Sequence, residues 1–376
     1  MGGYLNPGNE KFGEALNSQI YVDKTGLIEY TNRVMYSNQK YVCVSRPRRF
    51  GKSMAANMLA AYYSRGCDSR ELFQGLKISK SDVCEKKLNQ YNTIFLNMQE
   101  FLSRSKDMDQ LLDRLKRLVL RDIFQEYSEI DFFDRTDLVE SMRDIYQQTK
   151  CPFVIIIDEW DCIFREYREN HEAQEQYLDF LRDFLKDKDY IHLAYMTGIL
   201  PIKKYGTHSA LNMFDEFSMT NPGPLAEFVG FTEEEVAALC KQYGRNLSEL
   251  KEWYDGYHFE MARSIYSPRS VVTAILTGIC DSYWNRTETF EALRFYIDMN
   301  FEGLKDDVLS MLAGERIPVN TGTFSNDMTT FYSEDDVLTL LIHLGYLGYD
   351  FSYKEVFIPN SEVRGEYINA VAASQW

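Results

Sequence analysis

A run of five apolar residues, 153–157, followed at once by Asp158 and Glu159, constrains the fold of this chain more than any other stretch. A continuous apolar run of this length is typical of a central strand in a parallel sheet that is covered on both faces. In such sheets, ligands bind outside the carboxyl ends of the strands. The sequence therefore predicts an acidic ligand site at this strand end. A buried strand that ends in an ordinary acidic turn is the simpler alternative.

The stretch SRPRRFGKSM, from Ser45 to Met54, ends in the manner of a phosphate-binding loop. Residues 40–44 before it are apolar and β-branched and predict a buried strand, whereas residues 53–66 predict a helix that stops at Gly66. Strand, loop and helix is the context in which backbone N–H groups and a helix N-terminus surround phosphates. The alternative is a solvated basic turn that contains a Gly-Lys-Ser triplet.

The residues of this loop have predicted roles in binding a nucleotide. Gly51 lets the main chain approach the phosphates, Lys52 would reach the β and γ phosphates, and the Ser53 hydroxyl would hold Mg²⁺ together with Asp158. Arg46 stands where the pattern G-x-x-x-x-G-K-[ST] has its first glycine, so that pattern is not fully met. Because both motifs follow predicted strands, we predict a nucleotide site with these loop residues: Arg46, Pro47, Arg48, Arg49, Phe50, Gly51, Lys52, Ser53 and Met54.

Three residues are predicted to act on the phosphates directly. Lys52 would neutralise the charge on them, and Glu159 would polarise the attacking water as a general base. Thr197 ends another predicted strand, 191–198, and could hydrogen-bond the γ-phosphate or the water. Its alternative is a strand-end hydroxyl that satisfies nearby backbone.

The order of elements predicts an α/β fold with a parallel sheet, as in P-loop NTPases. Residues 92–98 predict a further strand, and amphipathic helices follow it and follow Asp158. A strand between the two motifs and a glutamate after the aspartate favour the ATPase branch over the GTPase branch. The sequence also has no Asn-Lys-x-Asp guanine signature.

Composition limits the partners and the cellular location expected for this protein. The formal net charge of -16 argues against nucleic-acid binding through bulk positive potential. No run reaches the roughly 18 apolar residues that a membrane span needs, and the first residues lack a basic segment followed by an apolar run, so we expect a cytoplasmic protein. The 7 cysteines contain no CxxC pair, so we expect reduced thiols and no metal site made of protein ligands alone.

Several motifs together resemble the predicted AAA-ATPase-like proteins of bacteria, which are often fused to a PD-(D/E)XK-type nuclease domain. The stretches that match are YVDKTGLI, SRPRRFGKS, IIIDEWD, MTGIL, GFTEEEV, EWYDGYHF, IYSPRSV and IPNSEVR. The resemblance implies that the arginine-bearing loop is a usual form and that Asp23 and Lys24 lie near the nucleotide, a helix N-cap being the alternative. It also implies a nucleic-acid partner through a nuclease that would follow Trp376, either removed from this chain or lacking in this member.

The second half of the chain is predicted to be mostly helical. We divide the chain into an N-terminal segment, 1–19, an ATPase core, 20–220, and a C-terminal region, 221–376. Thr232 and Glu235 have the spacing of a capping box, and a helix over residues 334–343 leads through Gly345 into a hairpin, as in winged-helix or lid modules. Within such a lid Arg263, Arg269 or Arg364 could sense the γ-phosphate, although ordinary surface roles are the alternative for each.

These observations predict a Mg²⁺-dependent ATPase that couples its nucleotide state to a C-terminal effector or partner. The usual nuclease partner of the resembling family points to nucleic-acid processing or defence, and a homo-oligomer is allowed. A nucleotide-loaded switch or scaffold with little turnover stays open as an alternative. So does direct binding of nucleic-acid phosphate by Arg46, Arg48 and Arg49.

Overall fold

The structure is a computed structural model, and it describes residues 2–202, 211–259, 262, 264–284, 290–299, 301, 303–326 and 328–373. The chain forms two compact units. The first comprises Met1–Val44, Lys52–Gly198 and Lys204–Glu216, and the second comprises Ser45–Gly51, Ile199–Lys203 and Phe217–Trp376. Arg263 lies outside the described residues.

The first unit is built on a five-stranded sheet in the order β2-β3-β4-β1-β5. Its strands are β1 (Tyr41–Ser45), β2 (Asn92–Asn97), β3 (Phe153–Asp158), β4 (Ile191–Gly198) and β5 (Asp215–Phe217). β2 pairs with β3, and β3 with β4, in parallel. Every residue of β3 is buried, which confirms the central strand predicted from the apolar run.

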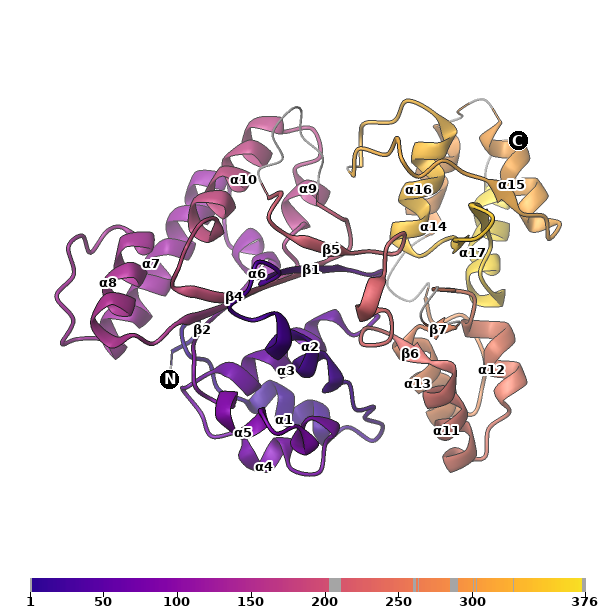
Figure 1. Cartoon of the computed structure of the whole chain (residues 1–376). Coiled ribbons are helices and arrows are strands. Elements are labelled where there is room, and N and C mark those ends of the chain that lie inside the picture. Colours follow the sequence, from indigo (N-terminus) through magenta and orange to yellow (C-terminus); the bar gives the residue numbers. More distant parts are fainter. Residues whose placement is uncertain are drawn as a thin grey trace. The chain divides into compact units, whose positions relative to one another are not determined.

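Helices cover both faces of this sheet, which confirms the predicted α/β class. In Figure 1, α2 and α3 lie on one side of the sheet, and α7, α8 and α10 lie on the other. The helices of the first unit are α1 (Glu10–Leu16), α2 (Gly26–Val34), α3 (Lys52–Tyr63), α4 (Arg70–Phe73), α5 (Cys84–Lys87), α6 (Met98–Ser103), α7 (Met108–Glu126), α8 (Leu138–Thr149), α9 (Cys162–Glu166) and α10 (His171–Leu185), with a 3₁₀ turn at Lys77–Lys80. The amphipathic faces predicted for α7 and α10 are buried, through Leu111, Leu115, Tyr177 and Leu181 among others.

β1 and β3 carry the two motifs, and β2 lies between them along the chain. In the sheet, however, a different strand separates them. β2, which follows the loop along the chain, lies at one edge of the sheet next to β3. β4, which follows Asp158, lies between β3 and β1. The ends of β1, β4 and β3 are therefore neighbours, because parallel strands finish at a common edge.

Helix α3 ends earlier than its composition predicts. It stops at Tyr63, and Gly66 lies in the turn beyond. A Cβ atom at Gly66 would stand 2.2 Å from the carbonyl oxygen of Asn6, so this glycine is required by a close backbone approach.

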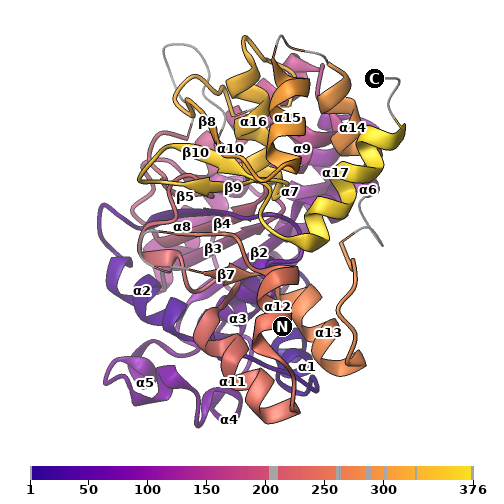
Figure 2. The same cartoon turned by 90° about the vertical axis from the view of Figure 1, so that its right-hand side faces the viewer.

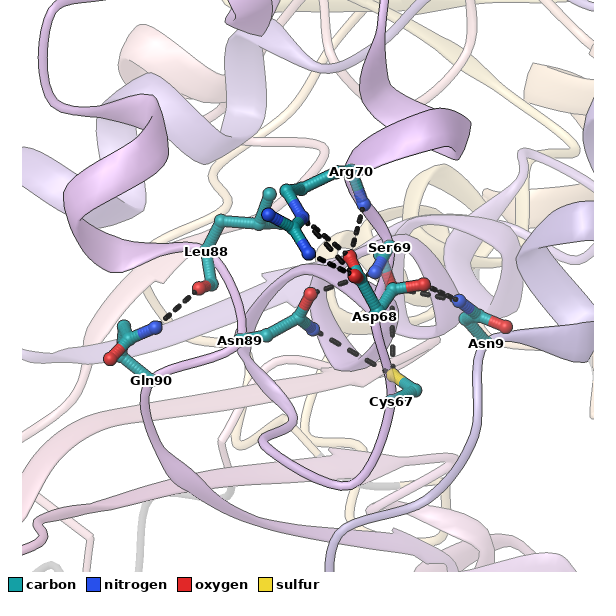
Figure 3. A network of polar contacts seen from close by, with 8 residues as sticks. All are labelled: Asn9, Cys67, Asp68, Ser69, Arg70, Leu88, Asn89 and Gln90. Atoms are coloured by element: carbon teal, nitrogen blue, oxygen red, sulfur yellow. Dashed lines mark hydrogen bonds and ion pairs between the residues drawn. The ribbon is translucent and has the colours of Figure 1, made fainter.

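Hydrogen bonds fasten the turn after α3 from two directions (Figure 3). Asn9 Nδ2 donates to the Asp68 carbonyl at 3.1 Å and to Ser69 Oγ at 2.9 Å. The N–H of Ser69 donates to Asn89 Oδ1 at 2.8 Å, and Asn89 Nδ2 donates to Cys67 Sγ at 3.7 Å. These contacts fix the C-terminal end of the helix that begins at Lys52.

The second unit is mostly helical, as predicted (Figure 2). Its helices are α11 (Glu233–Tyr243), α12 (Leu247–Tyr254), α13 (Pro268–Thr277), α14 (Phe290–Asp298), α15 (Leu304–Leu312), α16 (Glu334–Leu344) and α17 (Ser361–Ala373), with a 3₁₀ turn at Gly223–Leu225. Its strands are β6 (Phe231–Thr232), β7 (Ile265–Tyr266), β8 (Ile317–Pro318), β9 (Gly348–Asp350) and β10 (Glu355–Phe357). They form the sheets β6-β7 and β8-β10-β9. No helix in the described ranges has the length and apolarity needed to cross a bilayer.

Two local predictions for this unit are confirmed. Thr232 and Glu235 form a complete capping box at the start of α11. Helix α16 ends at Gly345, whose φ of 87° is left-handed, and β9 then pairs antiparallel with β10. This is the helix and hairpin predicted from the sequence.

A buried carboxylate on α17 organises the middle of the second unit. Glu362 Oε1 accepts hydrogen bonds from Ser270 Oγ at 3.0 Å, Tyr283 N at 2.8 Å and Trp284 N at 2.9 Å. The three donors come from α13 and from the segment after it. Burial raises the pKa of Glu362 to about 7, although these hydrogen bonds favour the charged form.

Candidate functional site

The edge of the first sheet brings together Lys52, Ser53 and Asp158. Lys52 opens α3 and is buried, and Asp158 ends β3 with 1% of its surface exposed. Burial raises the pKa of Asp158, and a hydrogen bond from the Ser53 side chain to its carboxylate opposes that rise. A lysine and an aspartate that are more than a hundred positions apart in sequence therefore share one site.

Opposite charges partly compensate the burial of these groups. Burial lowers the pKa of Lys52, while Glu159, Asp161 and Asp158 each raise it, with Glu159 the strongest of the three. Burial likewise raises the pKa of Asp158, and Lys52 opposes that change. Lys52 therefore lies in an acidic environment at the end of β3, where phosphate oxygens would compete for its ammonium group.

Glu159 follows Asp158 in an uncommon backbone conformation. Its φ is 54°, in the left-handed region that non-glycine residues rarely adopt. The turn is held because Trp160 N donates to the Thr197 carbonyl at 3.1 Å and Tyr177 Oη donates to the Trp160 carbonyl at 2.8 Å. The backbone is therefore fixed at the residue predicted to be the general base.

The side chain of Glu159 forms an ion pair with Arg165. Arg165 lies on α9, and its Nε is 3.4 Å from Asp161 Oδ2. Both Asp161 and Arg165 are buried. Neither was predicted from the sequence, although the spacing of i and i+4 at the start of a helix is a signal that could have found the pair.

Gly198 is a further residue that the sequence did not single out as part of the site. A Cβ atom there would stand 2.4 Å from Asp161 Oδ1 and 2.8 Å from the Trp160 ring. The glycine after Thr197 therefore allows the turn that carries Glu159 and Asp161 to pack against the end of β4.

The Thr197 hydroxyl lies at the predicted strand end and is fully buried. It donates to the carbonyl oxygen of Val44, on β1, at 3.0 Å. This contact matches the structural alternative considered for Thr197, and its sensing role stays a prediction.

Within the second unit, Arg46 is an anchor of the loop. Its side chain has 0% exposed surface, and Nη1 donates to the carbonyls of Ser45 at 2.8 Å and Phe217 at 2.9 Å. Its guanidinium also lies 5.0 Å from the centre of the Phe259 ring. These contacts direct N–H donors of the guanidinium to backbone carbonyl oxygens within the second unit.

The missing first glycine has a conformational explanation. The loop takes left-handed φ values at Arg49, 68°, and at Gly51, 91°, and Arg46 is not among the residues with a positive φ. Glycine's freedom is therefore not required at position 46.

Other loop residues also pack within the second unit. Arg49 Nη1 donates to the Tyr283 carbonyl at 3.1 Å. Phe50 packs edge-on to Tyr257, with ring centres 5.2 Å apart. Pro47 lies against Gly345, where an added Cβ would stand 2.8 Å from it. By contrast, Arg48 is exposed, and Ser53 and Met54 are exposed at the start of α3.

Asp23 and Lys24 lie in the first unit before α2. Asp23 Oδ1 accepts from Thr25 N at 2.9 Å and Thr25 Oγ1 at 2.6 Å, and Oδ2 accepts from Lys77 N at 2.7 Å. Asp23 therefore joins two segments of the first unit. The predicted role of Asp23 and Lys24 near the nucleotide stays a prediction.

Two of the three candidates for γ-phosphate sensing, Arg269 and Arg364, lie on helices of the second unit. Arg269 is exposed near the start of α13, and Arg364 is exposed on α17. The structure does not favour either of these two arginines as the sensor.

The oxygen atoms of Ser53 and Asp158 suit Mg²⁺. This ion prefers oxygen ligands in octahedral geometry and is usually held by one or two protein groups, with phosphates and waters completing the shell. A hydroxyl already hydrogen-bonded to a buried carboxylate provides such a pair.

Comparison with known proteins gives a family, a curated relative and weak likenesses to solved structures. A family model described as "Predicted AAA-ATPase" matches residues 9–207. The uncharacterized protein in the vnfD 5'region of Azotobacter chroococcum mcd 1 is 24% identical over 276 residues, which are 72% of this chain and 51% of that relative. The chain thus spans about half the length of the curated relative that it matches.

Two solved structures show a weaker likeness. The Aeropyrum pernix ORC2 protein, in ADPNP-ADP complexes, is 13% identical with a TM-score of 0.35 and covers 99% of this chain and 100% of its own. Cdc6p from Pyrobaculum aerophilum is 10% identical with a TM-score of 0.30, covering 98% and 99%. Both TM-scores are low, and no residue of this chain is assigned from either structure.

Proposed function

The chain belongs to the predicted AAA-ATPase family, and from that premise we propose that it binds ATP with Mg²⁺ and hydrolyses it to ADP and phosphate. One observation carries this proposal: Lys52, Ser53, Asp158 and Glu159 gather where β3 ends and α3 begins. A buried ammonium group among carboxylates, beside a helix N-terminus, is suited to a triphosphate and its cation.

Each residue has a distinct task in the proposed reaction. The N–H groups at the start of α3 and the Lys52 ammonium bind the β and γ phosphates. Ser53 and Asp158 would hold Mg²⁺, which supplies charge neutralisation on the phosphate oxygens when bound. Glu159 accepts a proton from the water that attacks the γ-phosphorus, and the bond from that phosphorus to the bridging oxygen of ADP breaks.

The loop connects this chemistry to the rest of the chain. Residues 45–51 are held by groups of the second unit, including the carbonyls of Phe217 and Tyr283, and the next residue, Lys52, opens α3 of the first unit. We propose that phosphate binding by the loop affects the C-terminal region, taken as residues 221–376, and through it an effector or partner. A role in nucleic-acid processing or defence would follow from a nuclease partner.

A nucleotide-loaded switch with little turnover is the second candidate function. The observation that bears on it is the ion pair of Glu159 with Arg165: in a switch this pair would keep the carboxylate from acting on water, whereas in an ATPase it would position it. Direct binding of nucleic acid by the loop arginines has less support, since Arg46 is fully buried and bonded to carbonyls.

Single-turnover hydrolysis of ATP separates the first two candidates. Wild type, Glu159→Gln and the exposed control Glu172→Gln are mixed in excess over labelled ATP. We expect the control to match wild type and Glu159→Gln to be slower by about 100-fold or more, the usual contribution of a general base. Equal and negligible rates in all three, with ATP retained, would favour the switch.

A further inference from the structure

Arg165 is a buried cation that the proposed reaction does not yet use. It lies on α9 with 8% of its surface exposed, it forms an ion pair with Glu159, and its Nε is 3.4 Å from Asp161. Building on the proposed function, we propose that Arg165 is a positioning residue that holds the Glu159 carboxylate toward the phosphates, and that Asp161 holds Arg165 in turn.

The fold fixes this arrangement at each step. Asp161 is the residue before α9, and Arg165 follows four positions later, so one helical turn places the two side chains on the same face. Asp161 is fully buried and packs where the lack of a side chain at Gly198 leaves room for it. The guanidinium therefore has a fixed partner on one side and Glu159 on the other.

The charges are consistent with a permanently charged Arg165. Burial lowers the pKa of Arg165, but Asp161 and Glu159 raise it by more, so its pKa is raised overall. Two carboxylates on one buried guanidinium share its charge, and the planar fork of arginine can serve both at once. A lysine would supply the charge without the fork.

The backbone position of Glu159 supports a role of Arg165 in holding the Glu159 carboxylate near the phosphates. Glu159 directly follows Asp158, the last residue of β3, so its backbone lies at the strand end where the phosphates are proposed to bind. The left-handed φ of 54° and the hydrogen bond from Trp160 N to Thr197 fix its backbone. Arg165 is the cation that fixes the carboxylate itself.

The first test compares turnover and affinity in three variants. We measure kcat for ATP and Kd for a non-hydrolysable ATP analogue in Arg165→Gln, Arg165→Lys and the exposed neighbour Arg168→Gln. We expect Arg165→Gln to lower kcat by about 100-fold, the usual effect of a misplaced catalytic group, with Kd nearly unchanged. Arg165→Lys should recover part of this loss, and Arg168→Gln should match wild type.

The second test asks whether Arg165 acts through Glu159. In a Glu159→Gln background, Arg165→Gln should cause little further loss of kcat, because the group it positions is already gone. Urea unfolding of the nucleotide-free proteins supplies a readout without activity: the downward shift of the midpoint caused by Arg165→Gln should be smaller in that background.

Three results would overturn the inference. Wild-type or faster turnover in Arg165→Gln would show that the ion pair restrains Glu159 or is irrelevant to it. Additive effects in the double variant would reduce Arg165 to a structural residue. A wild-type chain that binds the analogue without hydrolysing ATP would refute both the proposed hydrolysis and this role. Normal turnover in wild type together with normal turnover in Arg165→Gln, the first result above, would refute the role of Arg165 alone.

Discussion

Replacing Glu362 by glutamine should make the second unit more stable above neutral pH. All three hydrogen bonds to this side chain end on Oε1, from Ser270, Tyr283 and Trp284. A glutamine Oε1 can accept the same three bonds, and its Nε2 would stand in the place of Oε2. The change therefore removes a buried charge and keeps the contacts that organise the unit.

The magnitude follows from the pKa of Glu362, which burial raises from 4.5 to about 7, with the neighbouring Glu366 also raising it. Between these two values the folded chain keeps a proton that the unfolded chain has released. The free energy of unfolding therefore falls as pH rises from 4.5 to 7 and is constant above. At about 1.4 kcal/mol per pH unit, the loss is about 3 kcal/mol.

The assay is urea unfolding of wild type, Glu362→Gln and the exposed control Glu252→Gln at several values from pH 5 to pH 8. Wild type and control should lose stability with rising pH more steeply than Glu362→Gln. The glutamine variant should exceed wild type by about 3 kcal/mol at pH 8 and by little at pH 5. A difference between variant and wild type that does not change with pH would refute the reasoning.

Three further predictions concern the site and its loop. Gly198→Ala should lower Tm and slow ATP turnover, because the new Cβ would meet Asp161 Oδ1 at 2.4 Å. Overpacking of this kind costs about 1–3 kcal/mol, and an unchanged Tm would contradict the close contact at Gly198. Arg46→Met should cost about 3 kcal/mol in chemical unfolding, since carbonyls such as that of Phe217 lose a buried charged donor, whereas the exposed Arg48→Met should stay within about 0.5 kcal/mol; equal losses would argue against Arg46 as the anchor. Asp158→Asn should keep a hydrogen bond with Ser53 but raise the Mg²⁺ concentration needed for half-maximal hydrolysis by about 10-fold or more, and an unchanged Mg²⁺ titration would exclude Asp158 as the ligand.

Local patterns were enough to predict the main elements of the fold. The apolar run before Asp158 predicted β3, because a strand buried on both faces needs apolar residues at consecutive positions. Capping chemistry at Thr232 and a left-handed glycine at Gly345 marked helix ends in the second unit. Each of these signals lies within a few residues of the element that it defines.

The same reasoning could not predict contacts between residues that are far apart in sequence. The sequence predicts that Arg46 binds phosphate, but it gives no sign near the loop of the bond to the Phe217 carbonyl, 171 positions later. The position of β4 between β3 and β1 is likewise set by packing of the whole sheet. The ion pair of Asp161 and Arg165 is the exception, since its i, i+4 spacing was visible in the sequence.

The central claim is that Lys52 and Asp158 serve one triphosphate and its cation, and binding isotherms for fluorescent ATP test it most directly. Wild type, Lys52→Ala and the exposed control Lys106→Ala are titrated with and without Mg²⁺. We expect Lys52→Ala to bind about 10- to 100-fold more weakly than wild type and control, as the loss of one charged hydrogen bond to phosphate implies, with Mg²⁺ strengthening binding in wild type. Equal affinities in all three proteins, with or without Mg²⁺, would contradict the claim.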